Sequence, residues 1–297
     1  MKNSRLLPVL SLFLCAVCCA SAQISMEDRL YGYVLGIEGK SHDERGFFIE
    51  SQLREMGVGF FSSPFEQIRI HGDDTARIVG ENIIARIGKG KKTIVVGAHY
   101  DAVADSPGAN DDGSGVAVVL GLIQSLKNTA WNYSIEFCFF DREEDGLVGS
   151  AAYVRQFVDR RTHLAMVNLD VEGTGEEVYV GPVGSGDDDL LMPLVRQAAQ
   201  KTKFSYKEDE NYPDSDHESF AHEKLENISI SIVPKGDSEL LSEMVRNKWK
   251  VAPGRLPKVM RVMHTADDSS REMTPEALKT SYEFARAVLL LLNDCGK

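Results

Sequence analysis

Cysteine is scarce in this chain, and its scarcity excludes a fold held together by disulfides. The 297-residue sequence holds five cysteines, and three of them (Cys15, Cys18 and Cys19) lie in the first 19 residues. Only Cys138 and Cys295 remain beyond that segment, too few for a disulfide framework. Because Cys138 lies inside an apolar run at 135–140, we predict that it is buried in the core.

Long apolar runs are also missing after the N-terminal segment. The run from Leu6 to Cys19 is shorter than the ~20 residues that a spanning helix needs. Lys2 and Arg5 precede it and Ala20-Ser21-Ala22 follows it, which is typical of a cleaved signal peptide. We therefore predict a signal peptide at 1–22, a mature protein that is secreted or periplasmic, and no membrane span after cleavage. The alternative is an uncleaved anchor.

Positive charge is in deficit. The chain has 33 Lys and Arg against 45 Asp and Glu, a net charge of −12. Removing Lys2 and Arg5 with the signal peptide takes the mature chain from −12 to −14. Such an acidic protein is a poor partner for nucleic acid or for an anionic membrane.

What the sequence does contain is an alternation of strand-like and helix-like segments. We predict strands at 81–87, 93–98, 134–140, 164–169 and 228–233, with the first two paired through the turn at 88–91, and helices at 43–56, 116–126, 149–158, 189–201 and 275–292. The last helix has Thr274 as its N-cap and Pro275 at its first position. This pattern predicts one α/β domain over 23–297, a three-layer sandwich whose mixed, mostly parallel sheet is flanked by helices.

Acidic and imidazole side chains follow these strands. In open α/β sheets, ligands bind outside the carboxyl ends of the strands, so residues scattered over the chain should meet at one edge. The residues that follow the strands, including the short run at 259–263, are His99, Asp101, Asp141, Glu143, Glu144, Asp170 and His264.

Taken one at a time, these signals have ordinary explanations. A single His after a strand is usually a structural residue, Asp111-Asp112-Gly113 is usually a turn, and Glu143-Glu144 is usually a solvated pair. Together, two imidazoles and several carboxylates supply ligands for two cations, and zinc accepts both ligand types. The combination therefore predicts a metal centre.

The chain resembles the M28 family of two-zinc exopeptidases, which includes the secreted bacterial leucyl aminopeptidases. The resemblance is carried by five motifs in order, over roughly residues 80 to 290: His99-x-Asp101, Gly108-Ala-Asn-Asp111-Asp112-Gly-Ser-Gly115, Asp141-Arg-Glu143-Glu144-Asp-Gly-Leu-Val-Gly-Ser150, Val167-Asn-Leu-Asp170 and His264-Thr-Ala-Asp-Asp268. The segments at 43–56 and 236–260 lie outside it.

The resemblance implies a role for each residue. Asp111 would bridge two Zn²⁺ ions, with His99 and Asp170 completing one ligand set and Glu144 and His264 the other. Glu143 would be the general base. Asp101 would fix the tautomer and orientation of His99, and the peptide bond between Asp111 and Asp112 would be cis.

The resemblance also bears on the substrate. Ser215-Asp216-His217 is similar to a segment near the family's substrate pocket, so Asp216 and His217 are candidate substrate-binding residues. Met263 stands where several members carry a Tyr that helps to stabilise the oxyanion. No Arg cluster suited to a substrate carboxylate is evident, which favours an aminopeptidase acting on peptides with a free amino terminus over a carboxypeptidase. We also expect the protein to be a monomer.

Two other functions remain open at this point. A glutaminyl cyclase-like acyltransferase shares this fold and several motifs but uses a single zinc ion. The complete ligand set, especially His99 with Asp111, and the short connection from Glu144 to Ser150 favour the peptidase. A noncatalytic binding module of the same fold is disfavoured because every ligand and the base are present.

Overall fold

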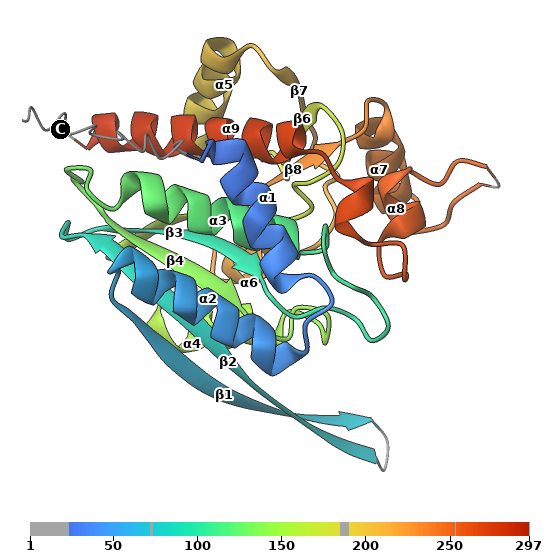
Figure 1. The fold of residues 1–297 in the computed structure, drawn as a ribbon, viewed down its shortest axis with the longest axis horizontal. Helices are drawn as coiled ribbons and strands as arrows, with labels where there is room; N and C mark the ends of the chain where they lie inside the picture. The colour runs from blue at the N-terminus through green and yellow to red at the C-terminus, as the bar shows by residue number, and fades with distance from the viewer. Residues whose placement is uncertain (1–23, 72–73, 185–189, 253, 297) are drawn as a thin grey trace, which may run out of the picture.

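The computed structural model describes residues 24–71, 74–184, 190–252 and 254–296. Within them, eight strands form one mixed sheet in the order β1-β2-β4-β3-β5-β8-β6-β7 (Figure 1). Their bounds are β1 Phe60–His71, β2 Asp74–Gly88, β3 Thr93–His99, β4 Ser134–Phe140, β5 His163–Leu169, β6 Glu177–Gly181, β7 Ser205–Glu208 and β8 Glu226–Val233. The neighbouring strands β4, β3, β5 and β8 run parallel.

Helices cover both faces of this sheet (Figure 1). The larger core lies on one face, under α1 (Met26–Ile37), α2 (His42–Met56), α3 (Gly113–Leu126), α5 (Leu191–Thr202) and α9 (Pro275–Cys295). A smaller core lies on the other face, under α4 (Val148–Phe157) and α6 (His217–His222). The short helices α7 (Asp237–Arg246), α8 (Val259–Val262) and η1 (Ser270–Glu272) complete the set. The predicted three-layer α/β architecture is confirmed.

Burial explains why the central strands read as continuous apolar runs. Every residue of β3 and β4 is buried, as expected for strands packed against helices on both faces. Cys138, in β4, is fully buried, as predicted, and is a free thiol. The central strands therefore run through the core, and several of the candidate ligands lie where these strands end.

The helix start predicted at Thr274 and Pro275 is confirmed, whereas the helix predicted at 116–126 begins earlier, at Gly113. The Thr274 hydroxyl accepts a hydrogen bond from the Ala277 amide at 3.2 Å, and Pro275 occupies the first turn of α9. At the start of α2, Ser41 and Glu44 form a capping box, the Ser41 amide donating to the Glu44 carboxylate at 2.9 Å. Such ends depend on residues close together in sequence.

Two predictions about strands are wrong. The strands on either side of the turn at 88–91 do not pair, because β4 lies between them: Gly88 and Thr93 both pair with Ser134. The connecting turn crosses the segment before β4 so closely that a Cβ on Gly90 would lie 2.1 Å from the Asn132 carbonyl oxygen. The run at 259–263, placed among the strands, is instead the helical turn α8.

Other differences concern the ends of the chain and of its elements. Strand β1 was not predicted, and β2 begins at Asp74 rather than at residue 81. The predicted signal peptide at 1–22 and the predicted helix start at 189 lie outside the described residues. In the part of the chain that the structure describes, no helix is both long and apolar enough to cross a bilayer.

Candidate metal centre

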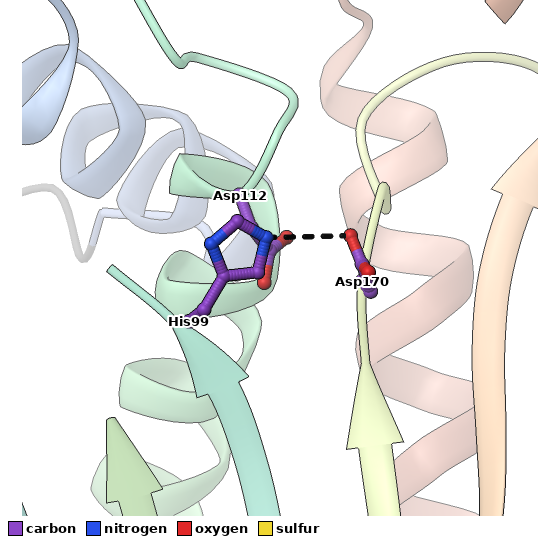
Figure 2. A group of neighbouring side chains, drawn as sticks. All are labelled: His99, Asp112 and Asp170. Atoms are coloured by element: carbon purple, nitrogen blue, oxygen red, sulfur yellow. Dashed lines mark ion pairs between the residues drawn. The ribbon is translucent and has the colours of Figure 1, made fainter. Parts of the chain in front are cut away.

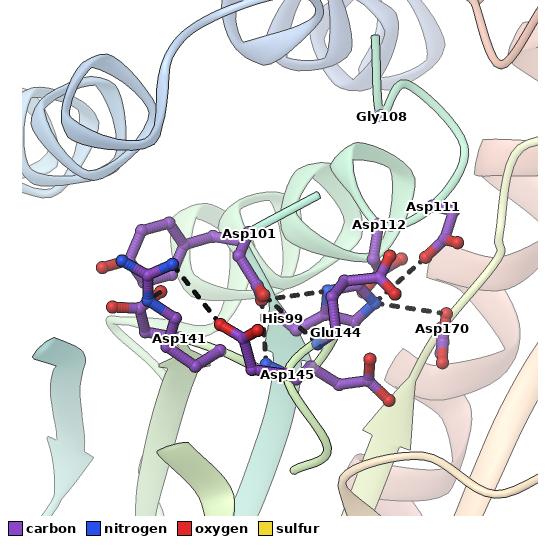
Figure 3. Close-up of polar contacts among 12 residues, drawn as sticks. His99, Asp101, Gly108, Asp111, Asp112, Asp141, Glu144, Asp145 and Asp170 are labelled. Carbon is purple, nitrogen blue, oxygen red and sulfur yellow. Dashed lines mark hydrogen bonds and ion pairs between the residues drawn. The ribbon is translucent and has the colours of Figure 1, made fainter. Parts of the chain in front are cut away.

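The predicted ligands meet at the carboxyl ends of the central strands (Figure 3). His99 is the last residue of β3, Asp170 follows β5, and the loop after β4 carries Glu143 and Glu144. Neighbouring parallel strands end at one edge of the sheet, which brings these side chains together. His264 reaches the same place from the turn after α8, where its backbone φ is +61°.

One group of possible ligands consists of His99, Asp112 and Asp170. Their ligand atoms all lie within 4.8 Å of one another, and Nε2 of His99 is 3.9 Å from Oδ1 of Asp170 (Figure 2). Oδ1 of Asp112 accepts hydrogen bonds from the amides of Gly115 and Val171, at 2.9 and 3.2 Å. Asp112 therefore serves as the N-cap of α3, and only its Oδ2 remains without a partner.

A second group consists of Asp111, Glu144 and His264. Nε2 of His264 lies 3.0 Å from Oδ2 of Asp111 and 3.3 Å from Oε2 of Glu144. The imidazole is half exposed, whereas the two carboxylates are largely buried. Like the first group, it combines one imidazole with two carboxylates, which are ligand types that zinc takes from proteins.

The Asp111 carboxylate spans the two groups. Its Oδ1 lies 3.1 Å from Nε2 of His99, and its Oδ2 lies 3.0 Å from Nε2 of His264. The peptide bond between Asp111 and Asp112 is cis, as the family resemblance implied. Each oxygen of a single carboxylate thus faces a different imidazole.

The residues fit a cation on grounds independent of their spacing. Oδ1 of Asp170, Oε1 of Glu144 and Oδ2 of Asp112 are buried and have no hydrogen-bond partner among the described residues. A buried carboxylate oxygen without a partner is costly, and a bound cation removes that cost. Imidazole with carboxylate is a donor set that suits zinc.

The pKa values at the site reflect crowded negative charge. Burial opposes the charged form of Asp111, yet hydrogen bonds to His264 and His99 hold its pKa below the ordinary value. Hydrogen bonds to Asp111 and Glu144 raise the pKa of His264 to about 10. Burial raises the pKa of Asp170. In the absence of a cation, protons on these groups offset part of the negative charge.

Asp101 contacts both His99 and the loop that carries Glu143 and Glu144. Its Oδ1 lies 3.4 Å from Nδ1 of His99 and accepts a hydrogen bond from the Glu143 amide at 3.1 Å. Its Oδ2 accepts one from the Glu144 amide at 3.2 Å. The carboxylate therefore faces the His99 ring and also holds the backbone of the loop that carries both glutamates.

The centre opens into a cavity of about 330 Å³ that is lined by the candidate ligands and by many apolar side chains. Glu143 lines this cavity, and burial raises the pKa of its carboxyl well above the usual range, with Asp216 adding to the effect. The apolar wall comprises Val171, Tyr179, Tyr212, Val233, Leu241, Trp249, Val259, Met260 and Met263. A short apolar group with a polar end fits such a space.

The structure places Asp216 and His217 behind the cavity wall. Both side chains are fully buried, and Ser215 and Tyr212 line the cavity in their place. Burial raises the pKa of Asp216 to about 7. The His217 ring packs edge-on against Tyr212, with ring centroids 6.0 Å apart. These residues thus lie behind the ones that would meet a substrate.

Two residues that support the centre were not predicted. The Asp268 carboxylate accepts hydrogen bonds from the amides of Asn110 and Asp111, at 2.9 and 3.2 Å. Asp268 belongs to the motif that begins at His264, but the family resemblance implied no role for it. Arg45 contacts the loop between His99 and Asp111, and its position on the otherwise apolar stripe of α2 was the available signal.

Comparison with known sequences gives a family match over most of the chain. Residues 82–289 match the model of peptidase family M28. Aminopeptidase YwaD of Bacillus subtilis is 38% identical over 117 residues, which cover 37% of this chain and 26% of that protein. Leucine aminopeptidase 1 of Aspergillus oryzae is 42% identical over 108 residues, covering 31% and 28% respectively. The chain thus matches about a quarter of the length of these curated relatives.

Solved structures support the fold. The zinc aminopeptidase BSAP from Bacillus subtilis superposes with a TM-score of 0.70 at 17% identity, covering 89% of this chain and 94% of that one. A glutaminyl cyclase from Porphyromonas gingivalis superposes with a TM-score of 0.67 at 20% identity, covering 90% and 97%. At such identities, both likenesses show a common fold and no more.

Proposed function

The chain belongs to peptidase family M28, and on that basis we propose that it is a two-zinc aminopeptidase. The observation that carries this proposal is the Asp111 carboxylate, whose two oxygens face two different imidazoles. Two cations held close together need an anionic bridge, and a carboxylate in this position suits that role.

The family resemblance implies the ligand assignment, and the distances in the structure are compatible with it. Asp111 would bridge two Zn²⁺ ions, with His99 and Asp170 holding one and Glu144 and His264 holding the other. Asp112 also lies close to His99 and Asp170, but its Oδ1 caps α3, whereas Asp111 faces both imidazoles, so we propose Asp111 as the bridge. Zinc ions bound there would polarise the scissile carbonyl and lower the pKa of a water molecule.

Glu143 would act as the general base. It lines the cavity beside the ligands, and its neighbour Glu144 points to His264. In this role its carboxylate accepts a proton from the attacking water and donates it to the departing amine. Hydrogen bonds from the Glu143 and Glu144 amides to Asp101 hold the loop so that the two side chains have different tasks.

The substrate would be a peptide with a free amino terminus. The carboxylates at the centre attract an α-ammonium group, and the apolar wall of the cavity accommodates the first side chain. The curated relatives are named as aminopeptidases, which agrees with this choice. We further propose that the mature, exported domain comprises residues 23–297 and acts as a monomer.

Purified protein lacking residues 1–22 tests this function. It should hydrolyse aminoacyl anilides, lose activity to a chelator, recover it with zinc, and hold two zinc ions per chain by mass spectrometry. Glu143→Gln should lower kcat by at least about 100-fold, the usual contribution of a general base, while keeping both zinc ions. Glu55→Gln, an exposed change on α2, is the matched control.

Other outcomes would overturn the proposal. Near wild-type turnover by Glu143→Gln would show that Glu143 is not the base. One zinc ion per chain, with cyclisation of a peptide that begins with Gln and no hydrolysis, would indicate the glutaminyl cyclase alternative. Zinc binding with neither reaction would indicate a noncatalytic binding module.

A further inference from the structure

Arg45 is a charged residue in the core. It lies on the inner face of α2, in line with Ile49, Leu53 and Met56, and only 2% of its surface is exposed. Moving a cation out of water costs several kcal/mol unless hydrogen bonds replace the lost hydration. A buried arginine on an apolar stripe therefore needs hydrogen-bond acceptors for its guanidinium.

The guanidinium binds the two ends of one loop. Its Nη1 donates to the Tyr100 carbonyl at 3.3 Å, and its Nη2 donates to the carbonyls of Pro107 and Gly108 at 2.5 and 3.3 Å. Nε donates to the Lys40 carbonyl, 3.2 Å away, in the connection just before α2. All four acceptors are main-chain oxygens, so the side chain ties the loop to α2.

The loop residues that Arg45 contacts lie close in sequence to two proposed metal ligands. Tyr100 follows His99 directly, and Gly108 precedes Asp111 by three residues. The planar guanidinium therefore bridges the segment between two proposed ligands whose side chains lie 3.1 Å apart. Figure 3 shows Gly108 and Asp111 on the same loop above His99.

Gly108 is shaped for this contact. Its φ of +60° favours glycine, and a Cβ at this position would lie 2.4 Å from Nη2 of Arg45. The loop is tied to the same part of the chain a second time, because the Gly39 amide donates to the Pro107 carbonyl at 2.8 Å. The loop and the connection between α1 and α2 thus fit each other closely.

We propose that Arg45 is a positioning residue of the metal centre: it clamps the loop at 100–108 so that His99 and Asp111 stand at ligand spacing before a cation arrives. This inference rests on the proposed function only in taking these two residues as zinc ligands. It extends the centre to α2, which precedes the part of the chain matched by the family model.

Charge and positioning make opposite predictions for zinc affinity. Asp101, Asp268 and Asp111 all lie within electrostatic reach of Arg45. If its positive charge alone mattered, removing it would leave a more negative site and tighten cation binding. If the clamp matters, removing it frees the loop and weakens binding. Loss of residues that orient metal ligands typically weakens metal affinity by about 10- to 100-fold.

The test compares Arg45→Gln and Arg45→Lys with the wild-type protein. Arg54→Gln is the matched control, because Arg54 is on the same helix but is exposed and pairs with Glu50. Zinc dissociation constants come from competition with a coloured chelator, and circular dichroism and thermal unfolding are recorded with and without zinc. We expect Arg45→Gln to bind zinc about 10- to 100-fold more weakly, Arg45→Lys to fall between it and the wild type, and Arg54→Gln to match the wild type.

The outcomes separate this inference from a structural role. If Arg45 only stabilises the fold, the folded apoprotein keeps its zinc affinity while thermal stability falls equally with and without zinc. Unchanged or tighter zinc binding by folded Arg45→Gln would overturn the proposal. Should that variant fail to fold, unchanged affinity in Arg45→Lys would overturn it. Wild-type protein that binds zinc but cleaves no peptide would contradict the proposed function and leave this test intact.

Discussion

Replacing Asp101 by asparagine should disturb the metal centre without changing the size of any side chain. The carboxylate accepts one hydrogen bond from the Glu143 amide and one from the Glu144 amide, and it faces Nδ1 of His99 at 3.4 Å. Asparagine keeps one acceptor oxygen, but its NH₂ group must then face either a backbone amide or the His99 ring. The change therefore removes one hydrogen bond to a charged acceptor. It also places the asparagine NH₂ group against another N–H donor, with no acceptor between them.

The size of the effect follows from these contacts. A hydrogen bond to a charged group contributes about 1.5–3 kcal/mol, and each ~1.4 kcal/mol corresponds to tenfold in rate. We therefore expect Asp101→Asn to lower kcat/KM by about 10- to 150-fold. The range agrees with the about 10- to 100-fold typical of residues that orient metal ligands. Zinc affinity should fall as well, because the orientation of the His99 ring is no longer set.

The assay is hydrolysis of a leucyl anilide at saturating zinc, with zinc affinity measured by chelator competition. Asp105→Asn is the control, because Asp105 is exposed on the same loop. A kcat/KM within threefold of the wild type, at full zinc occupancy, would refute the role given to Asp101. A fall in zinc affinity with kcat unchanged would show that it orients His99 but does not position Glu143.

Three further predictions concern pH, packing and metal removal. The hydrogen bond from His42 to Asp141, 2.7 Å long, raises the pKa of His42 in the folded state, so its stabilisation is complete below the ordinary histidine pKa of about 6.5 and is lost as pH rises through the raised value. Urea unfolding should thus show a larger loss for His42→Gln at about pH 6 than at about pH 9; equal losses would contradict the pairing. Leu120→Ala, at a fully buried position in α3, should lower the free energy of unfolding by about 2–5 kcal/mol, and a loss below about 1 kcal/mol would contradict the packing of α3. A chelator should lower the melting temperature, and added zinc should restore it, with a stabilisation that grows as the logarithm of the zinc concentration over its dissociation constant; an unchanged melting temperature would argue against a resident metal.

Some elements could be predicted because short-range patterns determine them. Helix α9 begins where Thr274 and Pro275 predict, and the central strands appear as apolar runs because both of their faces are buried. Other features depend on distant segments. The insertion of β4 between β2 and β3 is such a case, because no pattern near the turn at 88–91 reports that another strand occupies the intervening place.

The prediction of a strand at 259–263 is wrong for a related reason. Five apolar or basic residues suit a strand and a helical turn equally well, and packing decides between them. In the structure, the Val259 amide donates to Oδ2 of Asp237 at 2.9 Å, which anchors the first residue of α8. His264 still reaches the metal centre, but it arrives from a helical turn rather than from a strand end.

The sequence by itself determined which side chains could form a metal centre and that most of them follow strands, because both properties depend on residue type and local periodicity. Only the tertiary structure decided how they meet. Over the 165 positions from His99 to His264, the fold turns one Asp111 oxygen toward each imidazole, and it brings Arg45 from α2 onto the carbonyls of the loop between His99 and Asp111. Such contacts join segments that are remote in sequence, and packing of the whole sheet and its helices sets their distances.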